Sequence, residues 1–487
     1  MASISKSIGS GIFYIALSKY SRVFISVFIG AILARLLSPA EFGIVAMVSV
    51  FLSFFNLLGN FGIGPAVVQK NDLTDDEISS IFTFSILFGL VLAILFFLAA
   101  PLIASYYNNE TITNIARVMA LAILFQSLQV VPSALNRKKL RFKQIGIISV
   151  SSYVISGIIA IILAYKGFSY YALVINSIIS GILLFSAYYF LEPIRISFII
   201  RKSAIKKIAR FSAFQFFFSF INYFARNADN LLIGKYFNMD ALGLYDKSYK
   251  LMMMPVQNLT HVITPVLHPV LSKHQDDKKV IYNAYSKIVK LLAIIGFPLS
   301  VYLYFNATEI ITIMYGAKWI ESIPVFKLLA LTVAIQIVLS STGSIFQATN
   351  RTDLLFYAGL IGAILMLSGI GYGIFIGKNL VSVGNGLIIA FVINFLQALY
   401  LLIKYSLGFS YIKFLKIFIY PSIISSVLAF VLFFLSSIIQ NNSLIFTFFL
   451  KTVITIIIVG LFVVISKEYR NLINDYLLKK IRSKKDT

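Results

Sequence analysis

The chain has 487 residues, of which 59% are hydrophobic and only 12% are charged, and its mean hydropathy is +0.90. A soluble domain carries about 25% charged residues, so this composition excludes an ordinary soluble fold and indicates an integral membrane protein. The net charge of +24 is then typical of cytoplasmic loops that fix orientation, and we expect no nucleic-acid partner. Cysteine is absent and the three histidines lack metal-ligand spacing, so we expect no disulfide and no metal site.

The apolar segments are continuous and about 20 residues long, which predicts membrane-spanning helices and not the alternating strands of a barrel. We predict fourteen spans with mostly short connections, over residues 12–37, 42–67, 79–104, 113–134, 144–164, 169–190, 208–234, 242–267, 286–305, 322–346, 354–376, 380–403, 414–437 and 444–466. The first segment is long and carries Lys19 and Arg22, so we expect it to be a span and not a cleavable signal peptide.

Basic residues gather on one side of this predicted topology, in 137–143, 195–207, 273–279 and the tail 479–485. The positive-inside rule predicts that this side, with both termini, is cytoplasmic. Segment 192–207 mixes apolar and basic residues and is either an interfacial helix or a simple basic loop. On the opposite side, Tyr315 and Trp319 are expected to be interfacial anchors.

An offset of 200 residues aligns special positions in the two halves of the chain. Arg35 aligns with Lys235, Gly43 with Gly243, and Pro65 with Pro265. Such internal symmetry is typical of transporters built from repeated bundles, with the substrate path between them. We therefore predict an all-α membrane protein of two pseudo-symmetric six-helix bundles and two appended helices. The expected divisions are 1–200, 201–405 and 406–487, the last including a basic cytoplasmic tail.

Polar residues repeat every three or four positions in several predicted spans, so each set shares one helix face. In the seventh span this face consists of Ser212, Gln215, Ser219, Asn222, Arg226 and Asp229. In the eighth span it consists of Lys247, Lys250, Gln257 and His261. In the first span it consists of Ser18, Arg22 and Ser26, and in the second span of Ser49, Ser53, Asn56 and Asn60. An ionisable group in hydrocarbon costs at least about 2.5 kcal/mol, so we expect these faces to line a wet cavity, and the excess of cations predicts an anionic ligand.

Some of these residues have a second interpretation that needs no ligand. Arg226 and Asp229 are spaced for an i,i+3 ion pair, and Asp246 and Lys250 for an i,i+4 pair. Lys247 lies near the outer interface and could extend its ammonium to the surface.

Two further residues differ in how easily they are explained without a ligand. His261 is either a packed core histidine or a proton relay, and the sequence favours the first. Arg22 is harder to explain by packing, because it lies about 13 Å inside its span and no carboxylate precedes Glu41. It needs a partner from elsewhere or a bound anion.

The sequence contains no arrangement that points to catalysis. Paired carboxylates on one cavity face, a glycine-rich phosphate loop after a strand, and a Ser/His/Asp set are all missing. We therefore expect no enzymatic activity and no nucleotide-driven transport by this chain alone.

Segment 32–43, with the sequence ILARLLSPAEFG, resembles the opening of Wzx-type oligosaccharide flippases of the multidrug/oligosaccharidyl-lipid/polysaccharide exporter superfamily. Further motifs that fit this family lie at 60–69, 227–234, 241–245 and 255–258. The resemblance covers nearly the whole chain in motif order and spacing. It implies a V-shaped, MATE-like fold that works by alternating access.

The resemblance implies a function in the bacterial cytoplasmic membrane: moving undecaprenyl-pyrophosphate-linked oligosaccharide repeat units from the inner to the outer leaflet for surface polysaccharide synthesis. The residues expected to bind pyrophosphate are Arg22, Arg226, Lys247 and Lys250. The residues expected to contact the glycan are Gln215, Asn222, Asn56, Asn60 and Gln257. Asp229 and His261 are candidates for ion coupling, by proton or sodium, or for an ion pair; the membrane potential is another energy source. A polysaccharide polymerase and chain-length machinery are the implied partners.

Other functions remain open. A lipid II flippase could use the same cationic cavity. A multidrug/cation antiporter of the superfamily would favour an acidic cavity, whereas the first span here has no Asp or Glu. A non-transporting membrane protein of glycan assembly is the last alternative.

Overall fold

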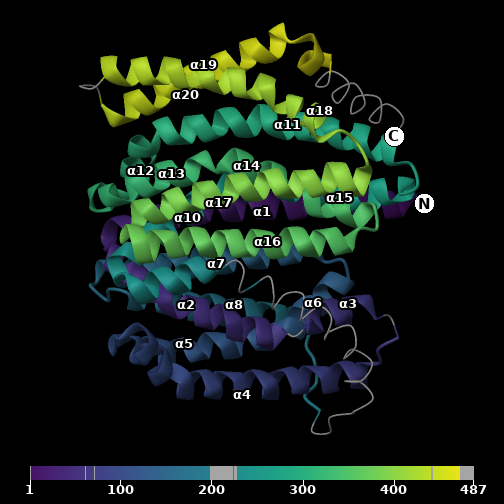
Figure 1. The fold of residues 1–487 in the computed structure, drawn as a ribbon. Coiled ribbons are helices and arrows are strands. Elements are labelled where there is room, and N and C mark those ends of the chain that lie inside the picture. The colour runs from purple at the N-terminus through teal and green to yellow at the C-terminus, as the bar shows by residue number, and fades with distance from the viewer. Residues whose placement is uncertain are drawn as a thin grey trace. The chain divides into compact units, whose positions relative to one another are not determined.

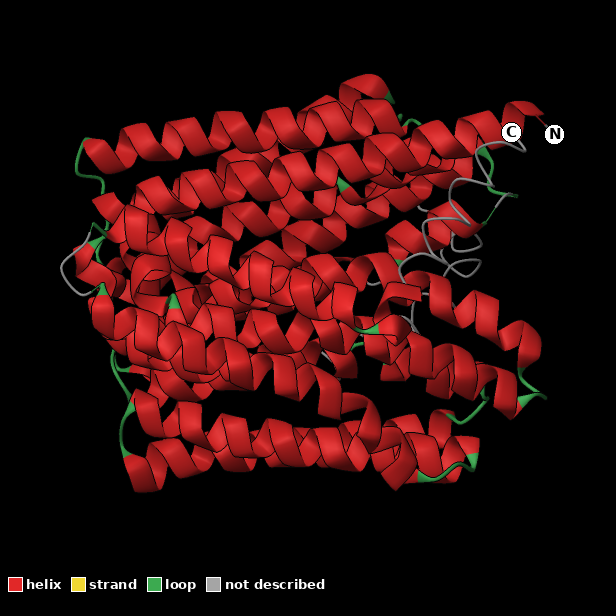
Figure 2. Ribbon diagram, turned by 90° about the horizontal axis from the view of Figure 1, so that it is seen from above, coloured by secondary structure: helices red, strands yellow, loops and turns green. Residues whose placement is uncertain are grey.

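The computed structural model describes residues 2–60, 62–70, 72–197, 223, 227–439 and 443–471; side chains are described from residue 16 onward, except at 261–266, 268–270 and 273. Within these residues the chain forms helices joined by short loops, with no strand (Figure 2). The predicted all-α class is therefore confirmed. The chain divides into two compact units, Met1–Gly243 and Leu244–Thr487, and each is described by itself. The divisions predicted at residues 200 and 405 stay predictions.

Among its described residues, the first unit contains the eight helices from α1 to α8. They are α1 (Ala2–Leu36), α2 (Pro39–Asn60), α3 (Ile63–Gln69), α4 (Asp75–Tyr107), α5 (Thr111–Leu128), α6 (Val130–Lys138), α7 (Phe142–Tyr165) and α8 (Tyr171–Leu191). Helices α4 and α5 form a long hairpin (Figure 1), and α7 packs against both α1 and α8. Small residues allow the close packing around α7, where Ala160 and Ala164 contact the apolar face of α1 that carries Ile29 and Leu33.

The second unit begins within α10 (Met239–Leu271) and ends in two helices that pack together. In between lie α11 (Lys278–Phe305), α12 (Ala307–Tyr315), α13 (Ile323–Leu331), α14 (Val333–Leu339), α15 (Thr342–Ala348), α16 (Thr352–Gly371), α17 (Leu380–Tyr400) and α18 (Tyr411–Leu415). Short 3-10 or π turns extend several of these helices, at Ser272–His274, Ala317–Ser322, Tyr372–Gly377, Leu401–Leu407 and Lys416–Phe418. The last pair, α19 (Ile419–Ile438) and α20 (Leu444–Ile465), lies along α11 (Figure 1).

A buried ion pair fastens α20 to α12 in the second unit. The Lys451 ammonium lies 2.6 Å from the Glu309 carboxylate and also donates to the carbonyl oxygen of Phe305 at 2.9 Å. The two charged side chains are only 4% and 7% exposed. A lysine in so apolar a helix is tolerated because its charge is neutralised on the side that faces the protein.

The number of spans is smaller in the described residues than the fourteen that we predicted. Eleven helices are long and apolar enough to cross a membrane, or up to twelve if the bent pair Ala317–Leu331 and Val333–Ala348 is one span. The expected seventh span, 208–234, lies largely outside the described residues. The expected eighth, α10, is a helix of 33 residues, but polar residues run through it and it is not among the eleven.

The tenth predicted span, 322–346, is bent by 43° and not straight. Hydroxyl groups bond to nearby backbone carbonyls along it: Thr332 to Leu329 at 2.7 Å, and Ser341 to Val338 at 2.7 Å. Side-chain hydroxyls that compete for backbone acceptors bend helices. The mostly apolar composition of this segment concealed the bend.

The two stretches that are 200 residues apart have the same local structure. Helix α1 ends at Leu36 and α2 begins at Pro39, with two residues between them. Two residues likewise separate a helix over 227–236 from α10, which begins at Met239. The turns are capped at matching positions. The Ser38 hydroxyl accepts from the backbone N–H of Glu41 at 3.3 Å, and the Asn238 side chain accepts from that of Ala241 at 2.7 Å. Glu41 also accepts from the Ser38 N–H at 2.6 Å, which completes a capping box.

The first turns of α2 and α10 touch each other within the first unit. A Cβ atom placed on Gly43 would lie 1.8 Å from the Met239 carbonyl oxygen, and one on Gly243 would lie 2.0 Å from the Pro39 carbonyl oxygen. The contact is reciprocal, because Met239 and Gly243 are the offset equivalents of Pro39 and Gly43. Equivalent residues that contact each other in this way mark an axis of local two-fold symmetry.

Candidate functional site

Arg22 lies on the face of α1 that packs toward α7, and its guanidinium is nevertheless exposed. It donates a hydrogen bond to the Ser149 hydroxyl at 3.2 Å and lies 5.8 Å from the centre of the Tyr153 ring. Ser149 and Tyr153 are four residues apart on α7 and therefore share one face. Among the described residues, no carboxylate bonds to this guanidinium.

The exposed side of Arg22 is not the side of α1 that meets lipid. The large exposed apolar residues of α1 lie on one stripe, which consists of Leu17, Tyr20, Phe24 and Phe28. At 100° per residue, Arg22 lies roughly 150° away from that stripe and in line with the buried Ile29 and Leu33. The exposed guanidinium therefore lies away from the apolar stripe, beside α7, where an anion could approach it.

A second group of cations lies at the C-terminal ends of α6 and α8, and most of it is neutralised. Lys139 and Arg141 both pair with Glu192, and Arg141 also donates to the Leu191 carbonyl oxygen at 2.8 Å. The fully buried Asn136 accepts from Arg141 at 3.3 Å. These basic residues are thus part of the local structure, as expected of loops that fix orientation.

Arg137 in the same connection differs from its neighbours. Its side chain is exposed, and no described residue forms an ion pair with it. Arg137 therefore remains available to an anionic ligand or to solvent.

The two asparagines of α2 that we assigned to the glycan differ in exposure. Asn60, at the end of the helix, is exposed. Asn56 is half-buried, and its side-chain oxygen is enclosed with no hydrogen-bond partner among the described residues. Of these two asparagines, Asn60 is the one whose side chain is in a position to meet a glycan directly.

In the second unit, α10 carries the two lysines that we assigned to the pyrophosphate. Lys250 pairs with Asp246 at 2.7 Å along the helix, so the i,i+4 alternative is realised, although its side chain is still 66% exposed. The Lys247 ammonium lies 5.3 Å from the centre of the Tyr315 ring of α12. Gln257 is exposed on the same helix.

Tyr315 and Trp319 are not interfacial anchors, and that prediction was wrong. They are 6% and 0% exposed, and their rings pack together with centroids 5.6 Å apart. Burying their large rings in the core next to α12 removes more apolar surface from water than a position at the membrane surface would.

Several predicted site residues lie outside what the structure describes. Gln215, Asn222 and Arg226 lie outside the described residues, and the side chain of His261 is not described. Asp229 is half-buried and accepts from the backbone N–H of Asn230 at 2.8 Å. The roles of these residues stay predictions.

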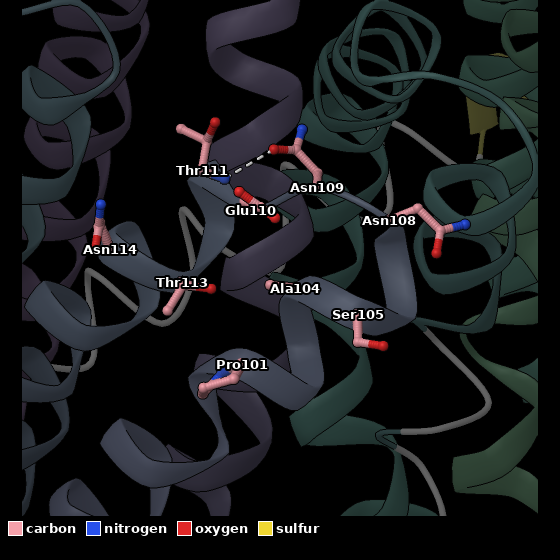
Figure 3. Close-up of a pocket in the computed structure, with 9 residues that line it drawn as sticks. All are labelled: Pro101, Ala104, Ser105, Asn108, Asn109, Glu110, Thr111, Thr113 and Asn114. Atoms are coloured by element: carbon pink, nitrogen blue, oxygen red, sulfur yellow. Dashed lines mark hydrogen bonds between the residues drawn. The ribbon is translucent and has the colours of Figure 1, made fainter.

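The sequence analysis missed two features of the first unit. One is the contact of Arg22 with Ser149 and Tyr153, which the i,i+4 spacing in the fifth span could have suggested. The other is a pocket of 920 Å³ where α4 turns into α5 (Figure 3). The run of polar residues from Asn108 to Thr111, after a long apolar helix, was its signal.

Comparison with known proteins gives the family of the chain. The profile of the family described as "Polysaccharide biosynthesis protein" matches residues 32–324, which is more than half of the chain. The teichuronic acid biosynthesis protein TuaB of Bacillus subtilis (strain 168) is 26% identical over 361 residues, which cover 73% of this chain and 74% of TuaB. The lipopolysaccharide biosynthesis protein WzxC of Escherichia coli (strain K12) is 25% identical over 414 residues, covering 81% and 82%. The succinoglycan biosynthesis transport protein ExoT of Rhizobium meliloti (strain 1021) is 23% identical over 342 residues, covering 70% and 69%.

Solved structures show the same fold at low sequence identity. The lipid II flippase MurJ, in an inward closed conformation, matches with a TM-score of 0.72 and 19% identity over 95% of this chain and all of MurJ. An inward-facing multidrug transporter of the MATE family matches with a TM-score of 0.61 and 14% identity over 77% of this chain and 93% of the transporter. The resemblance stated from the sequence motifs is thereby confirmed. The chain is a multi-pass membrane protein with a MurJ- and MATE-like fold, and it belongs to the polysaccharide biosynthesis protein family.

Proposed function

We propose that the protein is a flippase that moves undecaprenyl-pyrophosphate-linked oligosaccharide repeat units from the inner to the outer leaflet of the bacterial cytoplasmic membrane. It would work by alternating access, as a transporter and not an enzyme, in the synthesis of a surface polysaccharide. Family membership and the fold shared with a lipid II flippase support this proposal. So do relatives named for lipopolysaccharide and succinoglycan biosynthesis.

The observation that carries the proposal is the environment of Arg22. A guanidinium deep in a membrane span is costly unless water or an anion solvates it. Here it is fixed by Ser149 and Tyr153, exposed on a side of α1 away from the apolar stripe, and bonded to no described carboxylate. Its planar fork matches two phosphate oxygens at once, so a pyrophosphate is a fitting ligand.

The other proposed ligands of the pyrophosphate are Arg226, Lys247 and Lys250. Lys250 would contribute least, because Asp246 already neutralises it. For the glycan we propose Asn60 and Gln257, which are exposed in the structure. Asn56, Gln215 and Asn222 would join them in another state of the transport cycle.

Energy for transport would come from the membrane potential, from a coupled ion, or from both. A pyrophosphate that leaves the negative interior moves down the potential, which is worth about 2.3 kcal/mol per charge at 100 mV. Asp229 and His261 are the proposed sites for a coupled proton or sodium ion. We further propose that both termini are cytoplasmic, and that a polysaccharide polymerase with its chain-length machinery receives the product.

The test is the flux of a fluorescent lipid-linked glycan in vesicles that contain the purified protein. Replacing Arg22 by Ala should lower the flux about tenfold or more, because a hydrogen bond to a charged group contributes about 1.5–3 kcal/mol. Arg22→Lys should retain part of it. Lys413→Ala removes an exposed cation from the short helix α18 and serves as the matched control. Unchanged flux in the double variant Arg22→Ala/Arg226→Ala would contradict the assigned roles.

Lipid II is the second candidate substrate, because the protein shares its fold with the lipid II flippase MurJ at a TM-score of 0.72. The same vesicles should be loaded with lipid II in parallel. If lipid II crosses faster than any of the oligosaccharide repeat units tested, the protein is a lipid II flippase.

A further inference from the structure

Seven of the nine residues that line the pocket at the outer end of the α4–α5 hairpin have side chains that can hydrogen-bond, and one of the seven is the acidic Glu110. The pocket measures 920 Å³. Figure 3 shows the lining side chains coming from the end of α4, the turn, and the start of α5. The neutral polar residues among them are Ser105, Asn108, Asn109, Thr111, Thr113 and Asn114. A pocket for an apolar drug would be lined mainly by hydrophobic and aromatic side chains, whereas amides and hydroxyls suit the hydroxyl groups of sugars.

Hydrogen bonds hold the turn that carries the pocket in a defined conformation. Asn109 accepts from the backbone N–H of Thr111 at 3.0 Å, and its amide donates to the Met239 sulfur at 3.1 Å. Asn108 has a left-handed backbone, with φ of 52°, which ends α4 sharply. Asn109 is therefore a positioning residue, and the exposed side chains of Ser105, Asn108 and Asn114 are free to receive a ligand.

A cation lies directly below this pocket on the lipid-facing side of the hairpin. Arg117 is one helical turn beyond Asn114 on the same face of α5, and its guanidinium lies 5.2 Å from the centre of the Phe97 ring of α4. Phe97 is one turn before Pro101, which lines the pocket. The guanidinium is thus next to the pocket on both helices.

The surroundings of Arg117 indicate what its counter-ion is. Leu98 and Leu102 on α4 are 65% and 73% exposed, as expected of a surface in contact with acyl chains. Arg117 is exposed, and no described residue forms a hydrogen bond or ion pair with it. It lies six residues, or about 9 Å along the helix axis, beyond the start of α5 and beside this apolar surface. A lipid phosphate is the anion available there.

We propose that the α4–α5 pocket and Arg117 together bind the head group of a phosphate-bearing glycolipid in the outer leaflet. Arg117 binds the phosphate, and the amides, hydroxyls and Glu110 carboxylate of the pocket bind the hydroxyl groups of the attached sugars. The ligand approaches from the bilayer, so this is a docking site for the translocated lipid, separate from the interior site at Arg22. The inference rests on the proposed function and adds to it a place where the product is held. A phospholipid without sugar would leave the polar lining of the pocket unused.

The absence of cysteine from the chain allows a direct test of occupancy. Ser105→Cys adds one thiol in the pocket, and the full-length protein in phosphatidylcholine nanodiscs is labelled with a maleimide. Undecaprenyl-pyrophosphate-linked trisaccharide should slow the labelling in proportion to occupancy. Undecaprenyl phosphate and phosphatidylglycerol, which lack sugar, should slow it far less. The control is Lys166→Cys, an exposed position in the α7–α8 turn, where no ligand should change the rate.

Arg117→Gln in the Ser105→Cys background should weaken the protection about tenfold in apparent affinity, and Arg117→Lys should restore part of it. Equal protection by phosphatidylglycerol would overturn the proposal in favour of an ordinary anionic lipid. No protection by the trisaccharide lipid, or protection that is independent of Arg117, would also overturn it. Flux in vesicles separates the two proposals: flux without protection refutes only the docking site, and protection without flux refutes only the transport function.

Discussion

Gly43 and Gly243 face each other across the first turns of α2 and α10, and each is held against the backbone of the turn that carries the other. The ideal Cβ of either glycine would lie 3.1 Å from the backbone nitrogen of its counterpart. The obstructing atoms are main-chain carbonyl oxygens, which cannot move aside as a flexible side chain could. These two positions therefore accept no residue larger than glycine.

Gly43→Ala should lower the free energy of unfolding by about 2–3 kcal/mol, because the added methyl group forces two helix ends apart. Thermal unfolding of the purified protein in detergent measures this loss. The control is Gly30→Ala in α1, where nothing lies within 4 Å of the added atom. That variant should be slightly more stable than the original, because alanine favours a helix by about 0.5–1 kcal/mol over glycine. Equal stability of the two variants would refute the backbone contact.

Removal of Lys451 should destabilise the protein strongly, although the residue lies in an otherwise apolar helix. Lys451→Met leaves the Glu309 carboxylate buried without its partner, at a cost of about 3–5 kcal/mol. The double variant Lys451→Met/Glu309→Gln should recover most of the loss. A double-mutant cycle on thermal stability checks this, and strictly additive losses would show that the pair is not coupled.

Tyr153 should assist Arg22 through its ring and not through its hydroxyl. Tyr153→Phe should leave the flux of lipid-linked glycan nearly unchanged, because the ring face is retained. Tyr153→Leu removes the cation–π contact, worth about 0.5–1 kcal/mol, and should weaken the apparent affinity about two- to fivefold. Dependence of flux on substrate concentration measures the change. Equal effects of both variants would assign the role to the hydroxyl.

Membrane potential should drive the proposed transport in one direction. In vesicles that hold the protein in its cellular orientation, a potassium diffusion potential with a negative interior should accelerate outward flux, and the opposite polarity should slow it. The reason is the charge of the pyrophosphate, worth about 2.3 kcal/mol per charge at 100 mV. Flux that ignores the potential would mean that the substrate crosses with its charge fully compensated by a coupled ion.

The apolar runs were sufficient to predict the helical class and the breaks between helices near residues 38 and 238. The length and composition of each run are local signals, which do not depend on how distant helices pack. The offset of 200 residues likewise required only comparison of the chain with itself.

Contacts between distant helices were beyond such signals. Nothing near Trp319 in the sequence shows whether it faces lipid or the core, and Lys451 gives no hint of its partner Glu309. The same holds for Arg22: its depth was predictable, but its hold on α7 through Ser149 depends on which helices become neighbours. Side chains whose role is set by tertiary packing are thus the ones that the sequence analysis misplaced or missed.

The pairing of Lys451 with Glu309 also constrains how the polypeptide is made. The two residues are 142 positions apart, and the carboxylate leaves the ribosome first. By the time the last hydrophobic segment reaches the translocon, its acidic receptor is already threaded into the bilayer. The final helix can therefore take its place against α12 only after the segment that carries Glu309 is in the membrane.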